Sequence, residues 1–237
     1  MTDAATGILL AIETSQREGS VALRLPDGSI IEHAFPCGSR GEDNLLPTID
    51  MLFTRSGVAP CDLGVVVVSV GPGGFTGLRI ATSTAKGLAE GTGCRLVSIP
   101  SAMVAAETTV SLDGVHPPVV VLGAAKSTTC WLSRLDRSGD DWLESGRSGL
   151  HVIDPPESSV IELCEGAVVL ADQFLPDDLA GKLRGVREIM EPRWSATACA
   201  RIGERFASSG RFIDPLEMEP LYPREPEAVS LWKARNG

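Results

Sequence analysis

The sequence predicts an α/β protein whose N-terminal half runs β-β-β-α-β-α-β-α. Three short strand-like segments open the chain, and Pro26-Asp27-Gly28 marks a hairpin turn between the second and the third. Apolar runs of strand length then alternate with segments of helical periodicity. Because parallel strands need such helical connections, we expect strands of both directions in the first half of the chain.

The first three strands are expected to be consecutive and antiparallel. Gly7–Thr14 is apolar and short, as a central strand should be. Ser20–Leu25 alternates between core and solvent positions, and Ser29–Phe35 follows the hairpin turn.

A helix and a buried strand are predicted next. Five apolar residues lie on one helical face: Leu45, Leu46, Ile49, Leu52 and Phe53. Because proline is tolerated only in the first turn, Pro47 places the helix start near Asp43 or Asn44, and Gly57 ends the helix. Gly64–Val70 is continuously apolar, which predicts a strand parallel to the first.

A glycine-rich run, Gly71–Arg79, leads into a second helix that ends near Gly91. One face of this helix carries mostly small residues: Leu78, Ala81, Ala85, Leu88 and Ala89. Arg95–Ile99 is a further strand, and a third helix over 101–111 is expected to use Ser101 as its N-cap.

The second half gives weaker signals. His116-Pro117-Pro118 suggests a junction, so we expect a first lobe over residues 1–115 and a second over 116–237, with the C-terminal segment packing back on the first lobe. The expected elements are strands at 119–124 and 129–135, a loop at 138–149, a helix at 161–165, a strand at 167–171, an amphipathic helix at 196–207, an extended proline-rich stretch at 215–226 and a short helix at 226–235.

Composition and charge narrow the function. The 237 residues contain 21 Lys+Arg against 31 Asp+Glu, a net charge of −10, which opposes a stand-alone nucleic-acid binder because phosphate neutralisation dominates such binding. The six cysteines form no CxxC pair, and we interpret them as free thiols of a reducing compartment. The N-terminus has no signal-peptide pattern and no apolar run reaches membrane-span length, so we expect a cytoplasmic protein without a membrane contact.

The glycine run fits neither common nucleotide motif. Leu78 stands where a phosphate loop needs lysine, and Thr76 interrupts the spacing of a dinucleotide fingerprint. Two interpretations stay open: an anion site at a helix N-terminus, or a tight turn in which glycines take positive φ angles. The candidate anion-binding residues are Gly73, Gly74, Thr76, Gly77 and Arg79.

Metal and acid–base chemistry have little support. The three histidines, His33, His116 and His151, have no helical spacing that would bring two to one metal. Glu13 is the one early candidate carboxylate, and a surface residue at the end of a strand is its simpler interpretation. We therefore predict no catalytic residues and no metal ligands.

Particular motifs resemble a known family. Ile8-Leu-Leu-Ala-Ile-Glu-Thr-Ser15 with Gly19-Ser-Val-Ala-Leu23 resembles the opening of the two-lobed actin/hexokinase/Hsp70-like (ASKHA) fold. The run Val70-Gly-Pro-Gly-Gly-Phe-Thr-Gly-Leu-Arg-Ile80 strongly resembles the TsaB (YeaZ) family, and Tyr222-Pro-Arg-Glu-Pro-Glu-Ala-Val-Ser-Leu-Trp232 is similar to that family's C-terminal pattern. The similarity covers about residues 7–105 and 219–232.

This resemblance implies a non-catalytic scaffold or activator subunit. TsaB proteins pair with a TsaD-like catalytic subunit and a TsaE-like ATPase, and the set forms N6-threonylcarbamoyladenosine beside the anticodon of tRNAs reading ANN codons. The chain would then need no cofactor of its own, ATP and metal would belong to its partners, tRNA would be met only through the complex, and the chain alone could form a homodimer. The resemblance places pairing on the first two helices, at Leu45, Ile49, Leu78, Ala81, Ala85 and Leu88, and the alternative is that the same face packs on the chain's own sheet.

Departures from the family leave alternatives open. The catalytic relative carries two metal-binding histidines where this chain has Ser101-Ala-Met-Val-Ala105. The stretches Ser39–Asn44 and Ala124–Lys126 also differ from the family pattern, which puts a residual ligand site in doubt. An ATP-dependent kinase of the same superfamily is the alternative function, although Val119–Cys130 offers no carboxylate for it. A metallopeptidase lacks its ligands.

Overall fold

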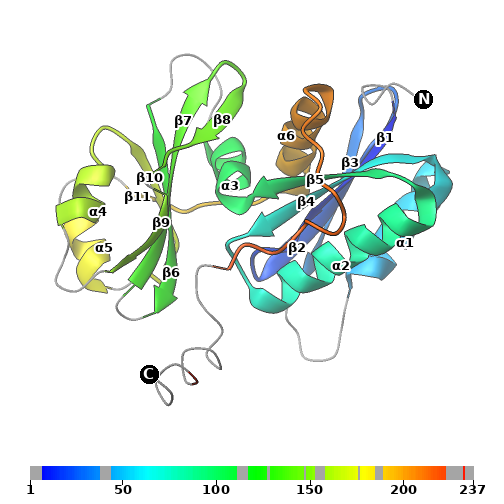
Figure 1. Ribbon diagram of the computed structural model, residues 1–237. Coiled ribbons are helices and arrows are strands. Elements are labelled where there is room, and N and C mark those ends of the chain that lie inside the picture. The colour runs from blue at the N-terminus through cyan, green and yellow to red at the C-terminus, as the bar shows by residue number, and fades with distance from the viewer. Residues whose placement is uncertain are drawn as a thin grey trace.

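The computed structural model describes residues 7–37, 44–110, 117–126, 129–146, 148–152, 158–175, 177–184, 189–222 and 232. These residues form two sheets that lie side by side, each with helices against it (Figure 1). The strand order is β3-β2-β1-β4-β5 in the first sheet and β11-β10-β6-β7-β8 in the second, where β9 also pairs with β7.

The first sheet has the predicted strands. β1 (Ile8–Glu13), β2 (Glu18–Arg24) and β3 (Ile30–Pro36) are antiparallel neighbours. β4 (Leu63–Gly71) pairs in parallel with β1, and β5 (Arg95–Pro100) pairs in parallel with β4. The predicted order β-β-β-α-β-α-β-α is confirmed, with a short 3-10 turn, η1 (Pro60–Asp62), before β4.

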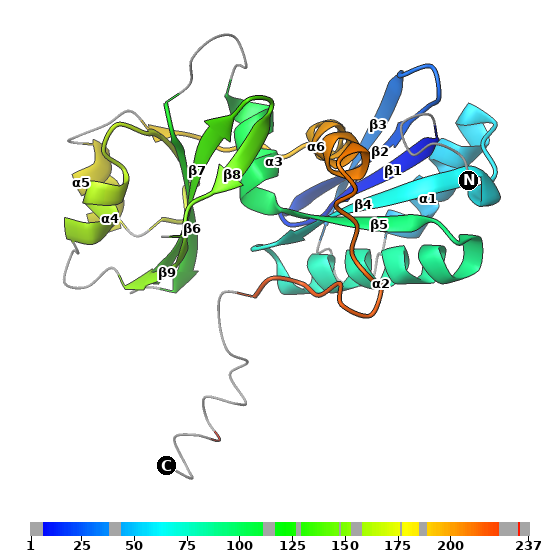
Figure 2. The same cartoon turned by 45° about the horizontal axis from the view of Figure 1, so that its top comes forward.

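Helices cover both faces of this sheet (Figure 2). α1 (Leu45–Ser56) and α2 (Phe75–Thr92) pack on one face with alternate strand residues such as Leu10. α3 (Ser101–Thr109) and α6 (Ala196–Ser208) pack on the other face. Successive strand residues point to opposite faces, so the continuously apolar β1 and β4 fill both layers.

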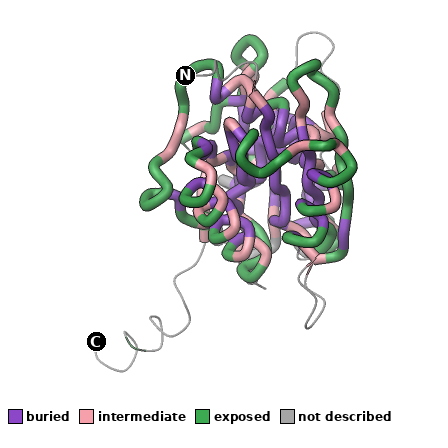
Figure 3. The backbone as a smooth tube through the Cα atoms, turned by 90° about the vertical axis from the view of Figure 1, so that its right-hand side faces the viewer, coloured by how far each residue is buried: buried purple, intermediate pink, exposed green. Residues whose placement is uncertain are grey.

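The second sheet is smaller and less regular. Its strands are β6 (Val119–Lys126), β7 (Thr129–Ser138), β8 (Asp141–Glu144), β9 (Gly149–Val152), β10 (Val168–Ala171) and β11 (Ile189–Met190). α4 (Ser158–Leu163) and α5 (Asp177–Arg184) cover one face, and α3 lies against the other. Buried residues gather in the interior of the molecule, as in β1 and β4, whereas β3 at the edge of the first sheet is mostly exposed (Figure 3).

Two segments from the C-terminal part of the chain pack against the first sheet. α6 contacts β1, β2, β4 and β5, although it follows the second sheet in sequence. After α6 the chain returns to the β5 edge, where Ile213 bridges Leu96, and Met218 is fully buried. Residues 215–217 form a turn rather than the predicted extended stretch, while 218–222 have no regular structure.

Several sequence predictions need correction. The predicted loop at 138–149 contains β8 and the start of β9, and α5 and β11 are additional elements. Ser101 is the first residue of α3 and not its N-cap, which is Pro100. The junction at 111–116 and most of the predicted C-terminal helix lie outside the described residues, so the boundary at 115/116 stays a prediction.

The six cysteines differ in burial. Four are buried, Cys37 is half-buried and Cys61 is exposed. Within the described part of the chain, no helix combines the length and the apolar character that crossing a membrane would need.

Candidate functional site

The glycine-rich turn between β4 and α2 packs directly against the turn that follows β1. The Gly74 amide donates to the Ser15 carbonyl at 2.7 Å. The Thr14 hydroxyl donates to the Gly77 carbonyl at 2.9 Å. Two hydrogen bonds to backbone carbonyls thus join two turns that are far apart in sequence.

Gly73 and Gly77 must be glycines because backbone carbonyl oxygens lie where their side chains would start. A Cβ on Gly73 would overlap the Ser15 carbonyl oxygen, and a Cβ on Gly77 would overlap the Thr14 carbonyl oxygen. A Cβ on Gly74 would lie 3.7 Å from the Ser15 oxygen, an ordinary contact. The expectation of positive φ is wrong for these three glycines; in this turn only Gly71 has one, at φ +111°.

Glu13 is the last residue of β1 and directly precedes the turn that the glycine-rich turn contacts. It is 1% exposed, so its interpretation as a surface residue at a strand end is wrong. Its Oε1 accepts from the Ser15 amide at 2.7 Å. Burial raises the pKa of the Glu13 carboxyl, and hydrogen bonds from Ser15 and Ser69 oppose that rise. The carboxyl therefore holds the turn of its own chain, a role that the sequence offers no pattern to detect.

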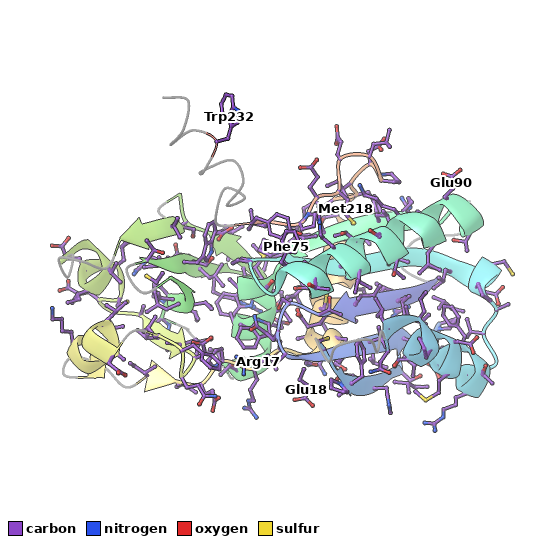
Figure 4. The ribbon with its side chains drawn as sticks, turned by 90° about the horizontal axis from the view of Figure 1, so that it is seen from below. Arg17, Glu18, Phe75, Glu90, Met218 and Trp232 are labelled. Atoms are coloured by element: carbon purple, nitrogen blue, oxygen red, sulfur yellow. The ribbon has the colours of Figure 1, made fainter. Side chains whose placement is uncertain are left out.

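An aromatic and cationic group stands at the exposed start of α2. Phe75, 53% exposed, packs on Tyr222 with 4.9 Å between ring centroids. The Arg79 guanidinium lies 4.5 Å from the centre of the Phe75 ring. The pKa of the Tyr222 hydroxyl is raised by burial, and the neighbouring Arg79 opposes part of that rise. Figure 4 shows Phe75 where the C-terminal segment passes the end of α2.

The predicted anion site shares these groups. Gly73, Gly74, Thr76 and Arg79 are exposed, and Gly77 is half-buried. The amide of Gly74 already donates to Ser15, and Arg79 is stacked on Phe75. Anion binding by this loop therefore stays a prediction that would have to displace existing contacts.

The side chains predicted to form a partner surface lie in the core instead. Leu78, Ala81 and Ala85 are 0% exposed, Leu45 and Ile49 are 1% and 3% exposed, and Leu88 is half-buried. Of the two interpretations of this face, the structure shows packing on the chain's own sheet, because the apolar stripe of each helix covers that sheet. A role of these six positions in pairing stays a prediction. The outward face carries Leu46, 56% exposed, with Ser83 and Gly87 of α2.

The start of α3, where the catalytic relative is expected to carry two metal-binding histidines, has a buried hydroxyl in this chain. Ser101, 2% exposed, accepts a hydrogen bond from the Ser69 hydroxyl at 3.2 Å, and Ala105 is fully buried. No group of three or more His, Cys, Asp or Glu side chains in the described residues could hold a metal ion. Residues 39–43 of the first departure lie outside the described residues; Ala124–Lys126 forms the end of β6.

The two sheets, their topology and the helices between them define a two-lobed α/β protein of the ASKHA type, as predicted. The structure of YeaZ from Pseudomonas aeruginosa superposes with a TM-score of 0.74 at 18% identity, covering 91% of this chain and 100% of that chain. A second structure, described as an uncharacterized protein with similarity to peptidase YEAZ from Pseudomonas aeruginosa, gives 0.74 at 19% identity, covering 92% and 100%.

Sequence comparison finds relatives that match part of the chain. The chain is 29% identical over 123 residues to the tRNA threonylcarbamoyladenosine biosynthesis protein TsaB of Escherichia coli (strain K12), covering 52% of this chain and 53% of that protein. It is 32% identical over 108 residues to the TsaB of Bacillus subtilis (strain 168), covering 46% and 45%. The chain thus matches about half the length of these relatives. Residues 39–144 match the family model "TsaD: tRNA N6-adenosine threonylcarbamoyltransferase". The chain is therefore similar in sequence to TsaB proteins over about half of its length and similar in fold to YeaZ, the resemblance that its motifs predict.

Proposed function

We propose that this chain is a non-catalytic scaffold or activator subunit of the assembly that forms N6-threonylcarbamoyladenosine in tRNAs reading ANN codons. The observation that carries the proposal is the shared name of the curated relatives, tRNA threonylcarbamoyladenosine biosynthesis protein TsaB. The match of residues 39–144 to the TsaD model supports a fold relationship with the catalytic subunit.

The non-catalytic role is supported by how the glycine-rich turn uses its groups. Its Gly74 amide donates to the Ser15 carbonyl, and Oε1 of the buried Glu13 carboxyl accepts from the Ser15 amide, so these two groups make hydrogen bonds within the chain. The alternative, an ATP-dependent kinase, would need groups of this kind free for substrate. The net charge of −10 further supports meeting tRNA only through basic surfaces of partners.

The proposed partner surface is the outer face of α1 and α2. Leu46 is a large apolar side chain exposed on α1, and a Cβ on Gly87 would meet no atom within 4 Å. An exposed apolar residue beside a small-residue stretch lets a second helix approach closely. The proposed occupants are a TsaD-like catalytic subunit or, for the isolated chain, a second copy; a TsaE-like ATPase joins the assembly. ATP and metal would be bound by those subunits, in the cytoplasm.

Enzyme assays on the pure chain separate this role from the kinase alternative. We expect neither ATP hydrolysis at ordinary enzyme rates, about 1–1000 per second, nor tRNA modification by the chain alone. The same preparation should co-purify with the TsaD-like subunit of its own organism. Metal-dependent turnover in that range would instead support the kinase.

A further inference from the structure

One hydrophobic cluster, the one around α3, contains residues of both lobes. α3 lies between the sheets, and its residues 101–107 are all buried. The cluster around α3 joins Val67 and Val97 of the first sheet to Val121 and Leu135 of the second. The orientation of the lobes is therefore decided at α3 and its neighbours.

A buried carboxylate at the C-terminal half of α3 ties three elements together. The side chain of Glu107 is 0% exposed. Its Oε2 accepts from Arg137 at 3.2 Å and from the Trp142 indole at 2.9 Å, both in the β7–β8 hairpin of the second sheet. Its Oε1 accepts from Arg205 of α6 at 3.0 Å, and α6 packs on the first sheet.

A second carboxylate also connects the second sheet to α6 and the residues after it. Asp141, at the start of β8, accepts from Arg205 at 3.2 Å and from Arg211, which follows α6. Asp141 is 28% exposed and Arg205 26% exposed. The Glu107–Asp141 cluster, which comprises Glu107, Asp141, Arg137, Arg205 and Arg211, therefore links the second lobe to the first through charge-assisted hydrogen bonds.

One further contact crosses between the lobes at the surface. The Arg17 guanidinium, from the turn after β1, lies 4.4 Å from the centre of the Phe174 ring, which follows β10. Phe174 is 50% exposed and Arg17 is exposed as well. Figure 4 shows Arg17 at the boundary between the lobes. Cation–π contacts in water are weak compared with buried, multiply bonded ion clusters.

We propose that the Glu107–Asp141 cluster is a lock that fixes the angle between the two lobes, and that the Arg17–Phe174 contact adds nothing to that angle. The cluster joins β8 to α6 around a buried carboxylate, and Arg205 bonds both carboxylates. Removing either carboxylate therefore breaks part of the connection between the hairpin and the helix. Losing Arg17 leaves the shared core and the cluster intact.

The interlobe distance tests the lock directly. Spin labels at Cys61, an exposed thiol of the first lobe, and at Glu165→Cys, an exposed position of the second, report the angle in a Cys37→Ser background. Asp141→Ala and Glu107→Gln should shift and broaden the distance distribution, whereas Arg17→Ala should leave it unchanged. Glu204→Gln is the matched control, because its partner Arg24 lies in β2 of the same lobe.

The outcomes are decisive in both directions. If Glu107→Gln does not fold, the more exposed Asp141→Ala carries the test. An unchanged distribution in folded Asp141→Ala overturns the proposal, and so does a broadened distribution in Arg17→Ala. A broadening in the Glu204→Gln control would equally overturn it, since the effect would then not belong to the cluster.

Discussion

The glycine-rich turn is held by backbone contacts that leave no room for side chains. Gly73 and Gly77 lie against the carbonyl oxygens of Ser15 and Thr14, while Gly74 has open space for a methyl group. Since these carbonyls belong to the backbone of the turn after β1, they cannot move away as the end of a flexible side chain could. The three glycines therefore carry different constraints.

Alanine substitution should separate these glycines. Gly73→Ala and Gly77→Ala should each lower the free energy of unfolding by about 1–3 kcal/mol, the usual cost of overpacking. Gly74→Ala is the matched control and should change it by less than about 0.5 kcal/mol. Thermal and urea denaturation measure all three; equal stability of the Gly77 and Gly74 variants would refute the close-approach explanation.

The buried Glu13 makes stability depend on pH. Because the pKa of Glu13 is raised in the folded chain, the folded state holds the proton more tightly than the unfolded state does. Its contribution is therefore present below the ordinary carboxyl pKa and is lost as pH rises through the folded value. Glu13→Gln keeps an acceptor for the Ser15 amide but cannot ionise, so the variant should gain melting temperature over the parent as pH rises from about 5 to about 8.

The exposed neighbour Glu18 supplies the control for that series. Glu18→Gln should follow the parent at every pH. A constant difference in melting temperature between Glu13→Gln and the parent across the range would show that Glu13 does not titrate there.

Arg79 decides between the two interpretations of the loop. With Arg79 stacked on Phe75 and the Gly74 amide engaged, we expect inorganic phosphate and ATP to give no thermal stabilisation of the parent. Arg79→Ala should then melt within a few degrees of the parent, with or without either anion. Phosphate-dependent stabilisation of the parent that disappears in Arg79→Ala would establish an anion site.

Elements with a strong local pattern are predictable from the sequence. β1 and β4 are continuous apolar runs, and α6 has an apolar stripe and a Ser195 N-cap, whose hydroxyl accepts from the Thr197 and Ala198 amides. β8, β9 and β11 are two to four residues long and exist through pairing with β7 or β10, which no local pattern reports.

The role of the apolar face of α2 could not be decided from the sequence for a related reason. Helical periodicity shows that one face of α2 is apolar, but it does not say what covers that face. Here the chain's own sheet covers it, through Ala81 and Ala85. The exposed positions Ser83 and Gly87 follow the same spacing of four on the opposite side, which is the signal that could have pointed outward.

A bulky charge on that outer face should block assembly. A Cβ at Gly87 would meet no atom within 4 Å, so we expect Gly87→Arg to fold but no longer to co-purify with the TsaD-like subunit. Gly181→Arg, in α5, is matched: it is also an exposed helical glycine with open space around its Cβ position. Normal complex formation by folded Gly87→Arg would place the partner surface elsewhere.

For the whole molecule, the central claim is a subunit that is required for tRNA modification without performing its chemistry. Sequence similarity to TsaB proteins and the internal hydrogen bonds of the glycine-rich turn support that claim, and the acidic charge fits contact with tRNA through partners. The resemblance to TsaB proteins can be found from the sequence motifs, whereas the internal contacts of Glu13 and Gly74 become visible only in the folded chain.

The most direct measurement is threonylcarbamoyladenosine formation on unmodified tRNA, using the TsaD-like subunit and the TsaE-like ATPase of the same organism with and without this chain. We predict modified tRNA only when the chain is present, no product from the chain alone, and restored product with the Gly181→Arg control but not with Gly87→Arg. Equal product in the absence of the chain, or product from the chain alone, would contradict the account.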